Sequence, residues 1–248
     1  MIGIFMGIFG LIIGSFLNVC IFRIPRDESI SFPPSHCTTC GTRIKPYDLF
    51  PVISYFVLQG KCRKCGEKIS IRYPLIELAT GTLFFLIYLK FGFTIELVKF
   101  TLFSCFLIVI GMIDFDTTDV YLSTTLTGII SGILFVIIAF ISRGSYLPFI
   151  FGGILAGGVI ALIILVTHGM GWGDFEICLL CGLFLGFKSS IVMLFFSFIF
   201  GGGIGALLLL TKKKGRKDHI PFGPFIVMGA LVAMFFGEQI INWYLNFL

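Results

Sequence analysis

The chain alternates between long apolar runs and short polar stretches along almost its whole length. A run of roughly twenty apolar residues can cross a bilayer as a helix, whereas a membrane barrel shows alternating segments of about ten residues. Since a backbone in lipid must satisfy its own hydrogen bonds, these runs predict helices. We expect eight membrane spans, over residues 1–22, 74–91, 95–113, 121–141, 148–167, 175–187, 189–210 and 221–247.

The sixth run, residues 175–187, is shorter than the others. It holds only about half the residues that a perpendicular spanning helix needs. We therefore expect this helix to be tilted, partly re-entrant, or lined by its neighbours.

Composition agrees with this pattern, because 57% of the residues are hydrophobic and only 12% are charged. A soluble globular protein of this length is excluded. We predict an all-α polytopic membrane protein of about eight transmembrane helices with a small zinc-binding cytoplasmic insertion. Its parts are a first transmembrane helix (1–22), a cytoplasmic loop domain (23–73) and a membrane core (74–248).

Basic residues are concentrated in two polar segments. Residues 23–72 carry nine of the eighteen lysines and arginines, and the loop 211–219 carries five. The positive-inside rule places both segments in the cytoplasm and both chain termini on the other side. We interpret the cluster Lys212–Lys217 as a topological anchor that contacts anionic membrane lipids, and we expect no nucleic-acid partner.

Four of the eight cysteines form two CxxC pairs in the polar segment, Cys37 with Cys40 and Cys62 with Cys65. Each pair is followed by a glycine, which permits a tight turn that aims both sulfurs at one point. Two such turns predict a tetrahedral four-sulfur site for a structural zinc ion. Disulfides or free thiols are the alternatives, but a reducing cytoplasm favours thiolates that bind metal. We expect the neighbouring His36 at the surface, because four sulfurs fill the coordination shell.

Two other motif-like spacings are interpreted as packing features. Cys178 and Cys181 lie one turn apart on an apolar helix and are expected to behave as small core residues. The run Gly201–Gly205 follows no predicted strand, so it indicates close helix packing rather than a nucleotide-binding loop.

Two aspartates at the ends of apolar runs are the candidate catalytic residues. Asp114 follows the third predicted span and Asp174 precedes the sixth, and both belong to the same membrane face. Two adjacent carboxylates can share one proton, so that one activates a water molecule while the other polarises a carbonyl group. This arrangement meets the needs of peptide hydrolysis, and the adjacent cysteine-bearing loop favours that interpretation slightly. Proton-coupled transport by the same carboxylates is the alternative that spacing alone leaves open, and Asp116 and Asp119 are alternatives to Asp114.

With these residues placed, the chain resembles the type IV prepilin peptidases, the bacterial branch of the GxGD membrane aspartyl proteases, over nearly its whole length. Gly171-Trp172-Gly173-Asp174 is similar to the family's GxGD motif, and Ile113-Asp114-Phe115-Asp116 is similar to its first aspartate motif. The two cysteine pairs resemble the family's cytoplasmic zinc module. Further similar stretches are Gly14-Ser15-Phe16-Leu17-Asn18-Val19, Arg23-Ile24-Pro25, Gly60-Lys61-Cys62-Arg63, Arg72-Tyr73-Pro74, Glu77-Leu78 and Pro221-Phe222-Gly223-Pro224-Phe225.

The chain departs from the family pattern after the first aspartate. The family usually has Ile-Pro-Asp or Ile-Pro-Asn there, whereas this chain has Val120-Tyr121-Leu122. The turn therefore lacks the proline and the polar residue that the family uses.

The resemblance implies a function, a substrate and a cofactor. Members of the family cleave the short basic leader from prepilins and pseudopilins, after a glycine, at the cytoplasmic face of the bacterial inner membrane. The resemblance assigns the catalytic roles to Asp114 and Asp174. It also implies methylation of the new N-terminal amine with S-adenosylmethionine, for which the sequence offers no independent signal and no assignable binding residue.

Overall fold

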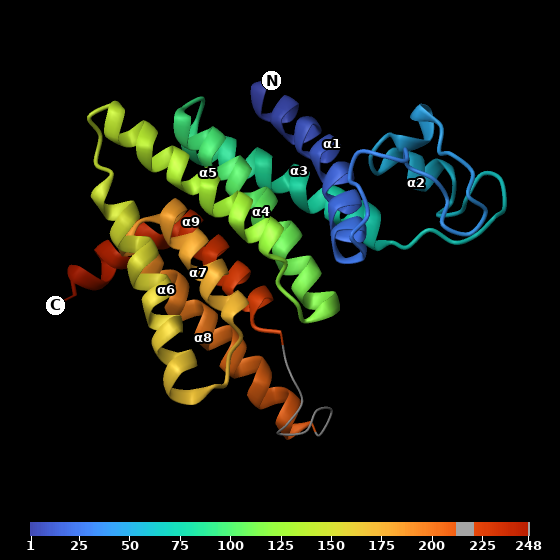
Figure 1. The fold of residues 1–248 in the computed structure, drawn as a ribbon. Coiled ribbons are helices and arrows are strands. Elements are labelled where there is room, and N and C mark those ends of the chain that lie inside the picture. The colour runs from blue at the N-terminus through green and yellow to red at the C-terminus, as the bar shows by residue number, and fades with distance from the viewer. Residues whose placement is uncertain (212–220, 248) are drawn as a thin grey trace. The chain divides into compact units, whose positions relative to one another are not determined.

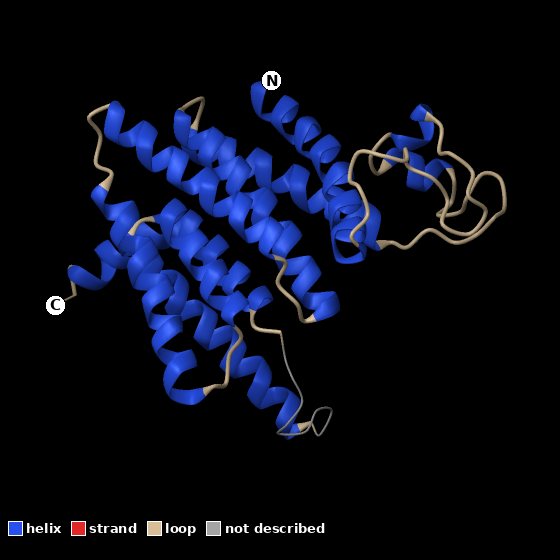
Figure 2. Cartoon of the chain, in the orientation of Figure 1, coloured by secondary structure: helices blue, strands red, loops and turns tan. Residues whose placement is uncertain are grey.

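The structure, a computed structural model, describes residues 1–211 and 221–247. The basic cluster Lys212–Lys217 therefore lies outside the described residues. Within those residues the chain forms helices and loops, without β-strands (Figure 2). The elements are α1 (Ile2–Arg23), η1 (Ile24–Arg26), η2 (Pro46–Leu49), α2 (Ile53–Val57), α3 (Arg72–Phe91), α4 (Ile95–Thr117), α5 (Leu122–Ile141), α6 (Leu147–Thr167), α7 (Trp172–Leu185), α8 (Phe187–Leu210) and α9 (Gly223–Leu245).

Seven of these helices are long and apolar enough to cross a membrane, among the described residues. They are α1, α3, α4, α5, α6, α8 and α9. The prediction of an all-α polytopic membrane protein is confirmed, and most predicted spans match a helix to within a few residues. The division into 1–22, 23–73 and 74–248 follows the polarity of the chain and stays a prediction.

The first compact unit, Met1–Val109, is built on the pair α1 and α3 (Figure 1). Glycines allow the two backbones to approach closely. A Cβ atom added at Gly10 would lie 2.8 Å from the Cα atom of Gly81. Between helices in lipid there is no hydrophobic driving force, so small residues stabilise the contact by allowing close van der Waals packing. The polar residues between α1 and α3 form loops, two short 3₁₀ helices and α2.

The second unit, Ile110–Leu248, is organised around α7. This helix has 14 residues and is about 21 Å long, which is less than the ~30 Å hydrocarbon core of a bilayer. It contacts α5, α6, α8 and α9 (Figure 1). Cys178 and Cys181 are fully buried in it, as predicted for packing residues. Of the three alternatives for the short sixth run, lining by neighbouring helices is therefore confirmed.

The glycine run on α8 packs less closely than the sequence suggests. Only Gly201 meets a close neighbour, because an added Cβ atom would lie 2.7 Å from the ring of Phe222. The same atom at Gly202, Gly203 or Gly205 would meet nothing within 4 Å. The interpretation as a helix-packing motif holds for the first glycine alone.

We predict that Gly182→Ala destabilises the second unit. A Cβ atom on Gly182 of α7 would lie 2.6 Å from the backbone nitrogen of Gly153 on α6 and nearer still to the carbonyl of Gly152. Such overpacking costs typically about 1–3 kcal/mol of unfolding free energy. Thermal unfolding in detergent should show a lower midpoint. The matched control is Gly158→Ala on α6, whose Cβ atom meets nothing within 4 Å; equal midpoints for the two variants would contradict this close approach.

Candidate active site and metal site

Asp114 lies within α4 and is only 3% exposed. The predicted span ended at residue 113, but the helix continues through Thr117. This end of the prediction was wrong because polarity marks the edge of an apolar run, not the end of backbone hydrogen bonding. The aspartate therefore projects from a regular helix, which restricts its position more than a loop would.

The carboxylate of Asp114 accepts a hydrogen bond from the first residue of α9. The backbone N–H of Gly223 donates to its Oδ2 atom at 2.9 Å. The first N–H groups of a helix have no partner within the helix, and they carry a partial positive charge. The bond therefore satisfies an N–H at the start of α9 and stabilises a negative charge on Asp114.

Glycine is required at position 223 by this contact. A Cβ atom there would lie 2.5 Å from Oδ2 of Asp114. Sequence reasoning noted the stretch Pro221–Phe225 but missed the role of Gly223. The available signal was a glycine between two prolines at the start of an apolar run, which marks a helix start but does not reveal its distant partner.

Asp174 occupies the first turn of α7 and is 8% exposed. Its Oδ2 atom accepts a hydrogen bond from the N–H of Gly171 at 3.3 Å, while its own N–H donates to the carbonyl of Gly171 at 3.1 Å. This reciprocal pair is a helix cap, so Asp174 is oriented by the same residues that begin the helix. The predicted span began at residue 175, and the structure moves its start to Trp172.

The second glycine of the GxGD motif is required by a close approach. A Cβ atom on Gly173 would lie 2.5 Å from the Cβ atom of Val120, whereas one on Gly171 would meet nothing closer than 3.9 Å. Val120 is the first residue of the stretch that departs from the family pattern. The loop after α4 thus packs directly on the start of α7 and links the elements that carry Asp114 and Asp174.

The structure buries both Asp114 and Asp174, and their carboxyl groups are close enough for Asp114 to act electrostatically on Asp174. The charge of Asp119 also acts on Asp114. Asp116 and Asp119 are exposed to solvent. A buried pair of carboxyl groups can share one proton and hold a water molecule between them, which exposed and separately hydrated groups do not do.

A further carboxylate near this pair was not identified from the sequence. Glu176 on α7 accepts a hydrogen bond from the hydroxyl group of Thr125, a fully buried residue on α5. The contact joins the two helices two residues after Asp174. No spacing rule connects residues 125 and 176, so only the fold reveals the pair.

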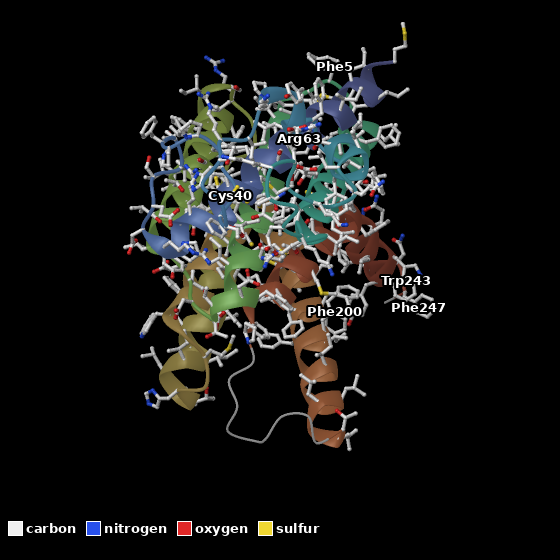
Figure 3. The ribbon with its side chains drawn as sticks, turned by 90° about the vertical axis from the view of Figure 1, so that its right-hand side faces the viewer. Phe5, Cys40, Arg63, Phe200, Trp243 and Phe247 are labelled. Atoms are coloured by element: carbon white, nitrogen blue, oxygen red, sulfur yellow. The ribbon has the colours of Figure 1, made fainter. Side chains whose placement is uncertain are left out.

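The four predicted cysteine ligands lie at one point. The Sγ atoms of Cys37, Cys40, Cys62 and Cys65 are all within 4.8 Å of one another, and the four residues could hold a metal ion. Figure 3 shows Cys40 and Arg63 in this part of the chain. His36 is exposed, as predicted. Four sulfur atoms in this arrangement suit the tetrahedral coordination of a structural metal site.

Each cysteine pair lies in the same type of turn. In the first, the N–H of Cys37 donates to the carbonyl of Thr42 at 2.9 Å, and the N–H of Gly41 donates to the carbonyl of Cys37 at 2.9 Å. Cys62 and Gly66 repeat this pattern in the second turn at 2.8 and 2.9 Å. Both glycines have positive φ angles of 66° and 74°, which favour glycine. The predicted turns are therefore confirmed.

The surroundings of two of the cysteines, Cys40 and Cys62, favour the thiolate form. Hydrogen bonds from the side chain and the backbone of Thr42 lower the pKa of the Cys40 thiol to about 6. Thiolates, not thiols, bind metal ions. Arg63, inside the second turn, forms a two-pronged ion pair with Asp48 at 2.6 Å and holds the pKa of that carboxyl below its usual value. This pair ties the second turn to η2.

Comparison with known proteins decides the family. Residues 8–91 match the family described as Bacterial Peptidase A24 N-terminal domain, and residues 101–206 match the one described as Type IV leader peptidase family. A protein of Bacillus subtilis (strain 168) is 33% identical over 247 residues, which cover 96% of each chain. The chain belongs to the type IV leader peptidase family. Membership in this peptidase family removes the support for the transporter alternative.

These relatives share one name. The Bacillus subtilis protein is named "Prepilin leader peptidase/N-methyltransferase". A Legionella pneumophila protein with this name is 34% identical over 98% of this chain and 94% of its own. One of Neisseria gonorrhoeae is 32% identical over 96% and 93%. No solved structure matches the chain. The type IV leader peptidase match includes Asp114 and Asp174, and the N-terminal match includes all four clustered cysteines.

We predict that the purified protein carries one metal ion per chain, bound by the four clustered cysteines. Cys62→Ser should remove it, because a neutral hydroxyl group replaces a thiolate ligand. Elemental analysis of the detergent-purified protein measures the metal content. Cys105→Ser is the matched control, since Cys105 lies on α4 outside the cluster. Equal metal content in both variants would contradict the assignment.

We also predict that the two glycines of the GxGD motif differ in tolerance. Gly173→Ala should lower peptidase activity by a factor of ten or more, roughly what a 1–3 kcal/mol steric penalty at the active site implies. Gly171→Ala should retain most activity, because its Cβ atom would meet nothing closer than 3.9 Å. Adding Val120→Gly to Gly173→Ala should restore part of the loss. Cleavage by membranes that contain equal amounts of each variant measures the effect, and the absence of rescue would argue against the Val120 contact as its cause.

Proposed function

We propose that the protein is an aspartic endopeptidase that removes the basic leader peptides of type IV prepilins and pseudopilins. The observation that carries this proposal is the buried pair Asp114 and Asp174, each held by a backbone N–H at the start of a helix. The names of the relatives supply the substrate class. The peptidase family match, which includes both aspartates, supports the reaction class.

In the proposed mechanism one aspartate is protonated and the other is ionised. The ionised carboxylate accepts a proton from a water molecule, which attacks the scissile carbonyl carbon. The protonated carboxyl group donates a hydrogen bond to the carbonyl oxygen. As the C–N bond breaks, the leaving amine takes the proton that the first carboxylate removed from water, and this carboxylate is ionised again. Both carboxylates accept a backbone N–H, but the bond from Gly223 to Asp114, at 2.9 Å, is shorter than that from Gly171 to Asp174, at 3.3 Å. The shorter bond stabilises the ionised form more, which supports Asp114 as the group that activates water.

We propose that cleavage takes place after a glycine, at the cytoplasmic face of the bacterial inner membrane. A prepilin is itself a membrane helix preceded by a positively charged leader, so its scissile bond reaches the membrane surface. Asp116 and Asp119 are exposed next to the buried pair. Their negative charges support a prepilin as the substrate, because they attract its positively charged leader. Membrane lipids are the other expected partners, and no nucleic acid is expected.

We further propose that the metal ion is zinc with a structural role, and that the protein methylates the new N-terminal amine. Four sulfur ligands leave no open coordination position, which supports a structural ion. Methylation would use S-adenosylmethionine, which supplies an electrophilic methyl group. The names of the relatives support this second activity. The described residues contain no glycine-rich loop after a strand, so we assign no residue to the cofactor.

We predict that Asp114→Asn and Asp174→Asn each reduce prepilin cleavage by at least about a thousandfold, since an amide neither takes up nor delivers the proton. The chain would be co-expressed with a prepilin, and the mass of the pilin N-terminus would be determined. That mass also reports an added methyl group. Asp116→Asn and Asp119→Asn are the matched controls and should leave cleavage within a few-fold of the unmodified protein. Normal cleavage by either buried-site variant, at equal protein level, would disprove the proposed mechanism.

A further inference from the structure

The cysteine-bearing segment presents a group of apolar side chains to its surroundings. Phe50 is 61% exposed, Ile53 64%, and Phe56 and Val57 both 69%. All four lie between η2 and the end of α2. A group of large exposed apolar side chains marks a surface that contacts a lipid bilayer or another molecule.

This apolar surface is anchored to the membrane helices by Glu77. The backbone N–H of Val52 donates to Oε2 of Glu77 on α3 at 2.7 Å. Glu77 is 7% exposed, so its carboxylate is buried where it accepts this bond. One buried carboxylate on α3 thus holds the residue immediately before α2.

The backbone of Val52 is strained where this bond forms. Its φ angle is 63° with ψ at −52°, a conformation that β-branched residues rarely adopt. A helix of five residues is not stable by itself, so α2 depends on its anchoring. The strain and the bond together indicate that the position of α2 relative to α1 and α3 is specified by the fold.

The depth of Glu77 places α2 at the membrane surface. Glu77 is the sixth residue of α3, about 8 Å along the axis from the start of the helix at Arg72. Helical side chains tilt toward the N-terminus, so its carboxylate lies nearer to that start. Because α3 is a membrane span, its start lies at the bilayer surface. Figure 1 shows the polar segment with α2 at the end of the pair where α1 finishes and α3 begins.

The charge of the segment suits a lipid surface. Residues 23–72 carry nine basic and only four acidic side chains. Basic residues beside apolar and aromatic side chains are the combination by which peripheral segments bind anionic bilayers. Attachment to spans at both ends also keeps the segment at the bilayer.

We propose that Phe50, Ile53, Phe56 and Val57 form a docking surface that inserts into the headgroup region of an anionic bilayer beside α1 and α3. The docking holds the metal-binding turns at a fixed height above the membrane. It requires only that the protein is embedded in a bilayer, and it does not depend on the proposed peptidase activity.

The test uses the full chain with one tryptophan as a reporter. Trp172 and Trp243 are replaced by phenylalanine, and Phe56→Trp places the reporter on the proposed surface. The protein is reconstituted in vesicles that contain anionic lipid and either ordinary acyl chains or acyl chains brominated near the headgroup. Bromine quenches tryptophan on contact, so a residue inserted to the depth of about 5–10 Å should lose roughly half of its emission or more.

The control reporter is Thr39→Trp in the same background, at an exposed position in the first cysteine turn. It should be quenched much less than the reporter at position 56. Equal quenching at the two positions would overturn the proposal. So would a blue-shifted but unquenched emission from position 56, because protein rather than lipid would then cover the surface. A red-shifted, unquenched emission would show contact with water and would overturn it as well.

Discussion

The buried carboxylates of the second unit depend on backbone N–H groups at helix starts. A carboxylate inside a membrane protein is costly unless hydrogen bonds replace its water. Asp114 accepts a hydrogen bond from the N–H of Gly223 at the start of α9. Asp174 accepts one from the N–H of Gly171 at the start of α7. A hydrogen bond to a charged group contributes about 1.5–3 kcal/mol, so each carboxylate also secures a helix end that would otherwise lack a partner.

This requirement explains the composition of the surrounding turns. The start of α9 approaches Asp114 on α4, and the start of α7 approaches the loop that follows α4. At both contacts there is no space for a side chain on the approaching residue. A Cβ atom would clash with Asp114 at Gly223 and with Val120 at Gly173. The glycines of these motifs therefore differ in purpose. One admits a carboxylate, one admits a neighbouring loop, and Gly171 supplies an N–H without any steric demand.

Patterns along the chain predicted most of the fold and both groups of candidate site residues. Apolar runs predicted the helices because lipid imposes that structure, and the repeated CxxC-Gly pattern predicted the cysteine turns because it is local. Contacts between distant residues were not predictable. The hydrogen bond from Gly223 to Asp114 joins residues that are 109 positions apart. The hydrogen bond from Val52 to Glu77 forms at a valine with a positive φ angle, a conformation that valine rarely adopts. The end of α4 was misplaced because polar side chains mark the edge of an apolar run, whereas the backbone hydrogen bonds of the helix continue through Thr117.

The two cysteine turns have a consequence for the unfolded chain. An ion held by all four sulfurs would cross-link residue 37 to residue 65 and so close a loop in a segment that has little apolar core of its own. Closing a loop of this size removes a few kcal/mol of chain entropy. The helices α1 and α3 already restrain the two ends of the segment. The cross-link therefore reduces further the conformational entropy of a chain that is already restrained. A single ion can therefore organise some fifty residues that hydrophobic burial alone would leave without a defined structure.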